Sequence, residues 1–482
     1  MLGAVISGLR WLRVAQREHY LAGSVTRFAI RWWTCSIENI AVFVLALIAI
    51  AATFRWCFPV FIIGGAIAIA PIGLTLKGRT SPLKWTRRLS TVAGVAALLI
   101  AVAVVTSVGF FGSGHNQLAL LISSCVALGI PVLIDLALAV LSPVEAMLAK
   151  RFVREASAKL HRIKPTIVAI TGSYGKTSTK NYVAHLLSQR YSVVATPASF
   201  NNMAGLSRAV NEKLALGTEI FVAEMGTYGA GEIEAMCAWM VPAIAVITAI
   251  GPVHLERMKT LDRVLEAKSE ITHKARQVVL NGDDPMLASL GGKLQSEGKT
   301  VRMAHATDVS DFEIPKGASP TNVACAIGVA RLLGLDEGVI RESLASLPDI
   351  PNRRVVHKSG GGFEVIDDTF NSNPAGCREA LELLASTGSR DGRKVVVTPG
   401  MIELGSQQDD ENFRFIRQAA RVASDIIVVG RTNRNALKAG ASGTQLNVVR
   451  AATRNEAVDW VKTNLGEGDA VLYENDLPDH FP

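Results

Sequence analysis

The sequence contains little that would indicate a disulfide-stabilised or nucleic-acid-binding protein. Its six cysteines are scattered without any paired spacing, so no disulfide framework and no cysteine-rich zinc site is indicated. Only 6% of the residues are aromatic, and the C-terminal two thirds has no basic stripe with interleaved aromatic side chains. We therefore predict reduced thiols and no nucleic-acid partner.

Charge of either sign is almost absent from four long stretches within the first 150 residues. These stretches are residues 40–54, 58–76, 91–110 and 118–141. They are apolar enough to predict four helices that cross a bilayer of about 30 Å, although the first is short and could instead be a buried soluble helix. A cleaved signal peptide is not indicated, because Arg10, Arg13 and Arg17 are followed by no compact apolar core with a cleavage site.

Basic residues gather on one side of this expected membrane region. They precede the first stretch, separate the second from the third and follow the fourth, whereas the opposite loops hold only Arg55 and His115. The positive-inside rule then places both termini in the cytoplasm. The basic N-terminal segment is expected either to lie along the anionic inner leaflet or to be an ordinary solvated helix. Asp135 is the one acid in these stretches, and it is expected to face a polar partner or a pathway.

From residue 164 onward, short Val/Ile-rich runs alternate with amphipathic helical stretches. Strands are expected at 166–170, 191–196, 220–224, 243–248 and 277–281, and again at 363–366, 394–398, 425–429, 446–449 and 470–473. Such alternation is typical of parallel α/β sheets. A turn at 348–352 separates the two series, which indicates a second α/β domain at the C-terminus.

A glycine loop follows the first of these strands. In Gly172-Ser-Tyr-Gly-Lys-Thr-Ser178, the glycines allow backbone amides to approach phosphate, Lys176 supplies a charge, and the Thr177 hydroxyl can bind magnesium. The usual pattern has a glycine where Ile170 stands, so this is the shorter Gly-x-x-Gly-Lys-Thr form. A plain glycine turn before a surface helix is the alternative.

Further motifs follow the loop in a fixed order. They are Phe200-Asn-Asn-Met-Ala-Gly205, Ala223-Glu-Met-Gly226, His254-Leu-Glu256, Ala267-Lys-Ser-Glu-Ile271, Asn281-Gly-Asp-Asp-Pro285, Pro351-Asn-Arg353, Ile366-Asp-Asp-Thr-Phe-Asn-Ser-Asn-Pro374 and Met401-Ile-Glu-Leu-Gly405. Together with the loop, this series resembles the Mur ligase family, and most of all the member that adds D-Ala-D-Ala. The resemblance covers about residues 164–482 and does not extend to the membrane region.

The resemblance implies an ADP-forming amide ligase, in which a carboxylate takes the γ-phosphoryl group of ATP and an amine then displaces phosphate. ATP and two magnesium ions are the implied cofactors. The implied nucleotide contacts are Gly172, Ser173, Tyr174, Gly175, Lys176, Thr177, Ser178, Asn322, Arg353 and Asp368. The implied catalytic residues are Lys176, Glu224, His254 and Lys268, and the implied magnesium ligands are Thr177, Glu224, His254 and a carbamylated Lys268. Asn201 and Asn202 are expected to contact the acyl substrate or to shape a turn.

The resemblance also divides the chain. We predict an amphipathic segment and four transmembrane helices in residues 1–150, a P-loop parallel-sheet ATP-binding domain in residues 151–350, and a Rossmann-like domain in residues 351–482. The predicted location is the bacterial inner membrane, which the chain crosses several times, with the ligase domains in the cytoplasm.

Three departures from the family pattern bear on the substrate. The domain that holds the uridine nucleotide has no counterpart, Pro399-Gly400 and Asn412 replace a Gly-Asp pair and a histidine, and Glu474-Asn-Asp476 replaces Lys-Gly-Ser. The last change would disfavour a free carboxylate on the amine donor, unless this segment is a surface strand end without contacts.

Three functions are therefore open. The first is a membrane-anchored ligase whose cell-envelope precursor is lipid-linked or close to the membrane. The second is a UDP-MurNAc-tripeptide–D-Ala-D-Ala ligase of peptidoglycan synthesis that is tethered beside other envelope-synthesis enzymes. The third is a nucleotide-binding switch or a transport-linked protein.

Overall fold

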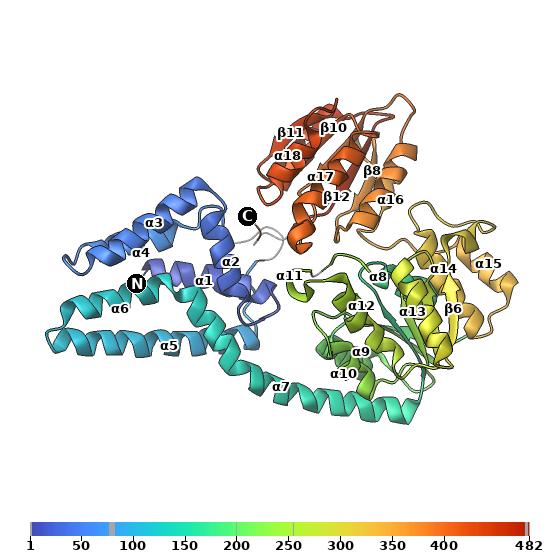
Figure 1. The fold of residues 1–482 in the computed structure, drawn as a ribbon, viewed down its shortest axis with the longest axis horizontal. Coiled ribbons are helices and arrows are strands. Elements are labelled where there is room, and N and C mark those ends of the chain that lie inside the picture. The colour runs from blue at the N-terminus through green and yellow to red at the C-terminus, as the bar shows by residue number, and fades with distance from the viewer. Residues whose placement is uncertain (1, 77–81, 199, 254, 478–480, 482) are drawn as a thin grey trace. The chain divides into compact units, whose positions relative to one another are not determined.

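A computed structural model describes residues 2–76, 82–198, 200–253, 255–477 and 481 (Figure 1). Contacts within the chain divide it into two compact units, one of residues 1–148 with 477–482 and one of residues 149–476. The three predicted domains stay a prediction, because no separate boundary divides the second unit.

The first unit is helical. Its helices are α1 (Leu2–Arg17), α2 (Ser24–Thr34), α3 (Ile37–Ala52), α4 (Pro59–Ile69), α5 (Arg87–Gly112), α6 (Asn116–Leu128) and the beginning of α7 (Ile130–Ile163). Within it, α5 and α6 run side by side (Figure 1). Helices α1 and α2 bury Trp11, Trp32 and Trp33 in the core of the unit, so these rings are not available to anchor the helices on a membrane surface.

The four expected membrane spans are not confirmed. Among the described residues, α5 and α7 are long and apolar enough to cross a membrane, and a third crossing counts only if α2 and α3, bent by 109°, form one span. The 16 residues of α3 extend over about 24 Å, and the 11 residues of α4 over less, because the helix ends before Pro71. The fourth expected stretch is broken at Gly129, between α6 and α7.

Polar side chains in this unit bind backbone groups at the breaks between helices. The Asp135 carboxylate accepts hydrogen bonds from the amides of Val25 and Thr26, at 3.2 and 2.7 Å, and so caps the first turn of α2. Asn39 accepts from the Ile72 amide at 2.7 Å and donates to the Trp32 carbonyl at 3.1 Å. The polar partner expected for Asp135 is therefore a helix end, which is a structural role.

The second unit contains two six-stranded sheets. The first is wholly parallel, in the order β2-β3-β1-β4-β5-β6, with β1 Thr166–Thr171, β2 Val193–Ala195, β3 Ile220–Glu224, β4 Ile244–Ile247, β5 Gln277–Asn281 and β6 Thr300–Ala304. The second has the order β11-β10-β9-β12-β8-β7, with β7 Val355–Lys358, β8 Glu364–Asp368, β9 Lys394–Thr398, β10 Asp425–Val429, β11 Asn447–Ala451 and β12 Ala470–Glu474. Only β7 is antiparallel to its neighbour.

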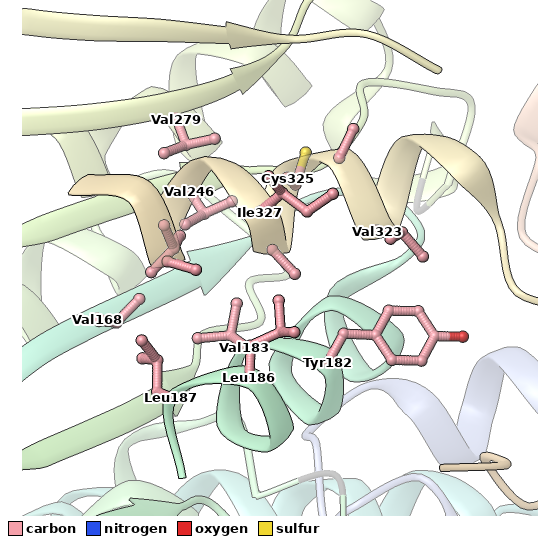
Figure 2. Packing of buried hydrophobic residues seen from close by; sticks show 14 of the residues in the cluster. Val168, Tyr182, Val183, Leu186, Leu187, Val246, Val279, Val323, Cys325 and Ile327 are labelled. Carbon is pink, nitrogen blue, oxygen red and sulfur yellow. The ribbon is translucent and has the colours of Figure 1, made fainter. Parts of the chain in front are cut away.

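Helices cover both faces of the first sheet, because alternate residues of its strands point to opposite sides. Val168 and Ile170 of β1 pack with α8 (Lys176–Leu187), α14 (Pro320–Leu332) and α15 (Glu337–Ala345), as Figure 2 shows for α8 and α14. Ile167 and Ala169 pack with α9 (Met203–Lys213), α10 (Glu232–Trp239) and α13 (Pro285–Ser296) on the other face. Two shorter helices, α11 (Leu255–Met258) and α12 (Leu261–Ser269), follow β4.

The second sheet is likewise covered by helices, namely α16 (Pro374–Ser386), α17 (Gln408–Ala419), α18 (Arg434–Ala441) and α19 (Arg454–Asn464). The expected parallel α/β architecture is thus confirmed in both sheets. Because parallel strands all end at the same edge, the residues that follow β1, β3 and β4 come together, and this is where open α/β sheets place ligands.

Candidate active site

The glycine loop between β1 and α8 has a backbone that only glycine adopts easily. Gly172 has a φ of +152° and Gly175 one of +78°. A Cβ atom on Gly175 would lie 2.2 Å from Asn322 Oδ1, so the loop also passes directly against α14. No side chain caps the first turn of α8, which leaves its amides directed at the loop, as in phosphate-binding sites.

Ser173 and Tyr174 brace this loop against the segment that follows β4. The Ser173 hydroxyl donates to the Gly251 carbonyl at 3.2 Å and accepts from the Gly251 amide at 2.9 Å. The Tyr174 hydroxyl occupies the space where a side chain at position 251 would lie. These two predicted nucleotide contacts therefore use their side chains to hold the loop, and the Ser173 amide donates to the Ala249 carbonyl at 2.7 Å.

Lys176 lies inside the loop. Its ammonium donates to the carbonyls of Gly172 and Ser173, at 2.7 and 3.3 Å. Burial lowers the pKa of this lysine, Glu224 opposes that effect, and the positive charge of Arg353 adds to it. A nearby anion such as a phosphate group would favour the charged form.

The carboxylate of Glu224, at the end of β3, gathers three donors. Thr177 Oγ1 donates to Oε2 at 3.0 Å, Lys180 Nζ approaches the same oxygen at 3.1 Å, and Asn201 Nδ2 donates to Oε1 at 3.1 Å. Glu224 is 1% exposed. The structure thus brings together Thr177, Glu224 and Asn201, which the motifs had singled out, and adds Lys180.

Lys180 was not predicted as a site residue, although its position in the sequence indicated a buried lysine. It stands one helical turn after Lys176, and a lysine on the inner face of a helix needs a buried partner. Asn202, by contrast, is not part of the cluster, because its side chain accepts the Gly205 amide at 2.9 Å and caps α9.

The Thr177 hydroxyl and the Glu224 carboxylate suit a magnesium ion, because both are hard oxygen donors and they already lie in contact. Within the ranges that the structure describes, no three His, Cys, Asp or Glu side chains gather closely enough to hold a metal ion. The residues therefore fit a magnesium ion that takes much of its coordination from water and phosphate rather than an all-protein cage.

Lys268, at the end of α12, is a buried lysine. It is 3% exposed, and its ammonium has no hydrogen-bond or ion-pair partner among the described residues. Burial, and next the charge of Lys176, hold its pKa well below the usual value, which favours the neutral amine. His254, its predicted companion, lies outside the described residues, so their pairing stays a prediction.

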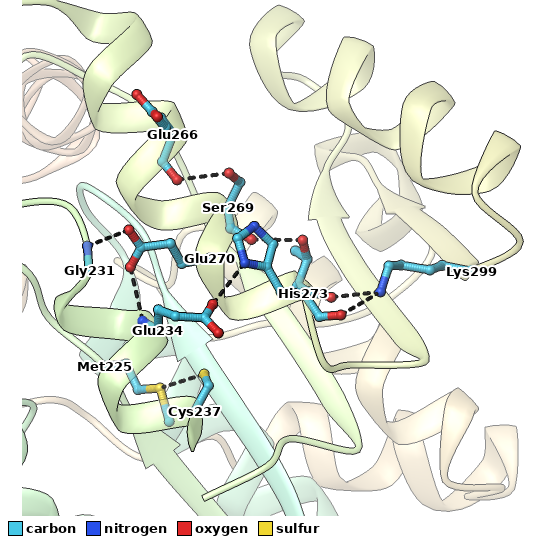
Figure 3. A network of polar contacts seen from close by, with 10 residues as sticks. Met225, Gly231, Glu234, Cys237, Glu266, Ser269, Glu270, His273 and Lys299 are labelled. Atoms are coloured by element: carbon cyan, nitrogen blue, oxygen red, sulfur yellow. Dashed lines mark hydrogen bonds and ion pairs between the residues drawn. The ribbon is translucent and has the colours of Figure 1, made fainter. Parts of the chain in front are cut away.

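The chain directly after Lys268 is fixed by a polar network (Figure 3). The Glu270 carboxylate accepts hydrogen bonds from the amides of Gly231 and Glu234, at 2.6 and 2.9 Å, at the beginning of α10. His273 contacts the Glu234 carboxylate at 2.7 Å, and Lys299 donates to three nearby carbonyls, including that of His273. This network sets the position of α12 and hence of Lys268.

A cavity of about 660 Å³ adjoins the loop. Six of the predicted nucleotide contacts line it, namely Tyr174, Gly175, Ser178, Asn322, Arg353 and Asp368. Asn281, Asp283, Asn373 and Arg378 also line it and were not predicted as contacts, although Asn281, Asp283 and Asn373 stand in motifs that the sequence had singled out.

Charges at this cavity are strongly desolvated. The Arg353 guanidinium lies over the Phe370 ring, 4.3 Å from its centroid, and burial lowers the pKa of this arginine. Arg354 pairs with Glu379. Burial raises the pKa of Asp368 to about 6, although Arg354 and Arg353 oppose the shift.

Each residue of the segment Glu474-Asn-Asp476 has a partner within the chain, so it is not a surface strand end without contacts. Glu474 is 1% exposed and accepts from the Ser372 hydroxyl at 2.6 Å. Asn475 donates to the Gly400 carbonyl at 2.7 Å, and Asp476 pairs with Arg454 at 2.6 Å. Burial raises the pKa of Glu474 to about 8. The hypothesis about the amine donor stays a prediction.

The two other departures from the family pattern, Pro399-Gly400 and Asn412, lie beside each other in the fold. Asn412 is buried, its side chain accepts from the Met401 amide at 2.8 Å, and it donates to the Met401 carbonyl at 3.0 Å. Asn433 and Asn475 bind the neighbouring carbonyls of Pro399 and Gly400. Three asparagines thus hold the backbone of the segment that replaces the Gly-Asp pair.

Two family models match the chain. The Mur ligase middle domain matches residues 170–323, and the glutamate ligase domain of Mur ligases matches residues 353–473. The first 169 residues lie outside both matches.

Similar proteins carry related names. A UDP-N-acetylmuramoyl-tripeptide--D-alanyl-D-alanine ligase of Mycobacterium tuberculosis is 30% identical over 344 residues, which cover 64% of this chain and 67% of that protein. The ligase of the same name from Bacillus subtilis is 26% identical, with 66% and 75% covered. The solved structure of MurF from Thermotoga maritima with ADP matches with a TM-score of 0.59 at 24% identity, covering 68% of this chain and 80% of that one, which shows a shared fold.

Proposed function

The chain belongs to the Mur ligase family of ATP-dependent, ADP-forming amide ligases, and we propose that it joins a carboxylate of a cell-envelope precursor to an amine donor through an acyl phosphate. The observation that carries this proposal is the contact between Thr177, at the end of the glycine loop, and the buried carboxylate of Glu224. This contact supports the proposal because Thr177 belongs to the loop that would hold phosphate and Glu224 is the carboxylate that would bind magnesium.

The proposed reaction has two steps. An oxygen of the substrate carboxylate attacks the γ-phosphorus of ATP, the bond to the β-phosphate oxygen breaks, and ADP leaves. The amine nitrogen then attacks the acyl carbon, phosphate leaves, and the amine loses a proton. Lys176 and the amides at the beginning of α8 would hold the phosphates, and Thr177 and Glu224 would hold a magnesium ion that neutralises developing charge.

Lys268 is proposed to be carbamylated and to serve a second magnesium ion together with His254. A neutral amine can attack carbon dioxide, which forms a carbamate and releases a proton. The burial of Lys268 and its lowered pKa support this step, because an ammonium has no lone pair for the attack. The product is an anion with oxygen donors, which suits magnesium.

The helical unit supports a location at the bacterial inner membrane. Helices α5 and α7 have the length and apolarity of membrane spans, and we propose that the chain crosses the membrane several times, with both termini and the ligase unit in the cytoplasm. A ligase tethered in this way would encounter an inner-leaflet, lipid-linked precursor at a high effective concentration.

A second candidate is the synthesis of peptidoglycan from a soluble precursor. The names of the relatives favour it, since they describe the addition of D-alanyl-D-alanine to UDP-N-acetylmuramoyl-tripeptide. Tethering would then serve assembly with other envelope-synthesis enzymes.

A comparison of precursor pools in cells tests these candidates. We would measure lipid-linked and soluble envelope precursors by mass spectrometry in cells that carry wild type, Lys176→Ala, or Lys293→Ala as a control at an exposed position of α13. Accumulation of an unamidated lipid-linked species in Lys176→Ala cells supports the leading proposal. Accumulation of UDP-N-acetylmuramoyl-tripeptide supports the second candidate. Unchanged pools of lipid-linked and soluble precursors would contradict both candidates.

A purified system separates an enzyme from a switch. The full chain in detergent would be supplied with ATP, magnesium and either membrane extract or UDP-N-acetylmuramoyl-tripeptide with D-alanyl-D-alanine, and ADP release would be followed. An increase that requires Lys176 supports catalysis. No increase with any extract or substrate would favour a nucleotide-binding switch.

A further inference from the structure

A buried ion pair lies beside the proposed magnesium ligands. Lys180 stands on α8, three residues beyond Thr177, and its ammonium is 3.1 Å from Glu224 Oε2. The two side chains are 2% and 1% exposed. Both charges are therefore largely withdrawn from water, and removal of one leaves the other buried without its opposite charge.

The same ammonium also holds a second piece of backbone. Lys180 Nζ donates to the Ala198 carbonyl at 2.6 Å. Ala198 has a φ of +42°, in the left-handed region that favours glycine, so this conformation costs free energy and needs support from its surroundings. The hydrogen bond from Lys180 is one such support.

Asn201, three residues beyond Ala198 in the sequence, contacts the same carboxylate. Asn201 donates to Glu224 Oε1 at 3.1 Å, and its carbonyl accepts from the Gly226 amide at 2.7 Å. The two oxygens of Glu224 are therefore held from opposite sides, one by Lys180 and Thr177 and the other by Asn201. Lys180 thus contacts both the Glu224 carboxylate and the Ala198 carbonyl.

We propose that Lys180 is a positioning residue, which orients the Glu224 carboxylate for magnesium and fixes the Ala198 backbone so that Asn201 reaches the same carboxylate. This inference rests on the proposed magnesium role of Thr177 and Glu224. Lys180 would act through Glu224 and would not touch the transferred phosphoryl group.

The test uses the full chain in detergent with ADP and magnesium as probes. Lys180→Met keeps an unbranched side chain that is one heavy atom shorter and removes the charge, and Lys293→Met is the matched control at an exposed site. Binding of ADP is measured by calorimetry, with and without magnesium. In Lys180→Met, we expect the magnesium concentration for half-maximal enhancement of ADP binding to rise about tenfold, because the charged hydrogen bonds that orient the Glu224 carboxylate are lost. Binding of ADP without magnesium should be unchanged.

A second variant guards against a failure to fold. Lys180→Gln is shorter and uncharged but keeps a donor for the Ala198 carbonyl, and circular dichroism would verify its folded state. The same rise in the magnesium requirement is expected. A magnesium requirement equal to that of wild type, or lower, in folded Lys180→Gln or Lys180→Met would overturn the inference. If ADP binding to wild type does not depend on magnesium, it is instead the proposed magnesium site that fails.

Discussion

Replacement of Gly175 by alanine separates backbone strain from a direct collision at the nucleotide site. Gly175 has a φ of +78°, and an alanine there costs about 1–2 kcal/mol of stability from the backbone alone. Its Cβ would also lie 2.2 Å from Asn322 Oδ1, a distance that real Cβ atoms do not adopt. Either the loop or Asn322 must therefore move, and both line the cavity beside the loop.

Gly217→Ala is the matched control. Gly217 has a φ of +89°, and a Cβ atom there would meet nothing within 4 Å. Gly217→Ala should therefore lose about 1–2 kcal/mol of stability through the same backbone strain, which lowers the Tm by about 1–3 °C in a unit of this size. Its ATP binding should be unchanged. Gly175→Ala should lose more stability and should also weaken ATP binding at least about tenfold, because the loop or Asn322, both of which line the cavity, must shift by about 1 Å.

The double variant Gly175→Ala/Asn322→Ala completes a thermodynamic cycle. Asn322→Ala removes the colliding amide, so the loss in Gly175→Ala/Asn322→Ala should be smaller than the sum of the two single losses by about 0.5–3 kcal/mol. Calorimetric ATP binding and thermal unfolding of all four proteins provide the measurements. If Gly175→Ala binds ATP as wild type does and loses no more stability than Gly217→Ala, the reasoning about the loop is refuted.

Three other predictions concern the helical unit, the second sheet and the buried lysine. Asp135→Ala removes the cap of α2 and should cost about 0.5–2 kcal/mol in detergent, measured as a lower Tm, with ADP release unchanged; a changed activity at unchanged stability would instead indicate a pathway role. The pKa of Glu474 is raised to about 8 from an ordinary value of 4.5, so its folded form retains a proton that the unfolded chain loses, and stability should fall as the pH rises from 4.5 to 8. Glu474→Gln should reduce this fall, and equal pH profiles of Tm for both proteins would contradict the shift. Lys268→Met cannot form a carbamate and leaves no buried charge, so it should lower kcat by about 100-fold or more at a nearly unchanged Tm, whereas retained activity would exclude the carbamate.

The glycine loop and the strand ends could be predicted from the sequence because their chemistry is local. A Gly-Lys-Thr run between an apolar strand and a helix has few other uses, and strands buried on both faces appear as continuous Val/Ile runs. Two edge strands, β6 and β7, were missed, since they carry charged residues such as Arg302 and Lys358 and lack a continuous apolar run. Hydropathy alone predicted four membrane spans, which the described helices do not confirm, because hydropathy does not register the breaks before Pro71 and at Gly129.

Pairings between distant residues could not be predicted in the same way. The sequence shows that Asp135 is an acid in an apolar stretch, but only the packing of α7 against α2 decides that it caps a helix. The sequence shows that Glu474-Asn-Asp476 replaces a Lys-Gly-Ser segment, but only the fold decides that the glutamate is buried against Ser372.

The sequence by itself determined the family, the ATP chemistry and the residue types of the site, because these depend on short motifs whose order along the chain is preserved. The tertiary structure decided which of those side chains meet. It joined Thr177, Lys180 and Asn201 at the Glu224 carboxylate, and it left Asn202 as a helix cap. The physical reason is that a carboxylate withdrawn from water must find its donors from whichever elements the sheet brings to the same edge.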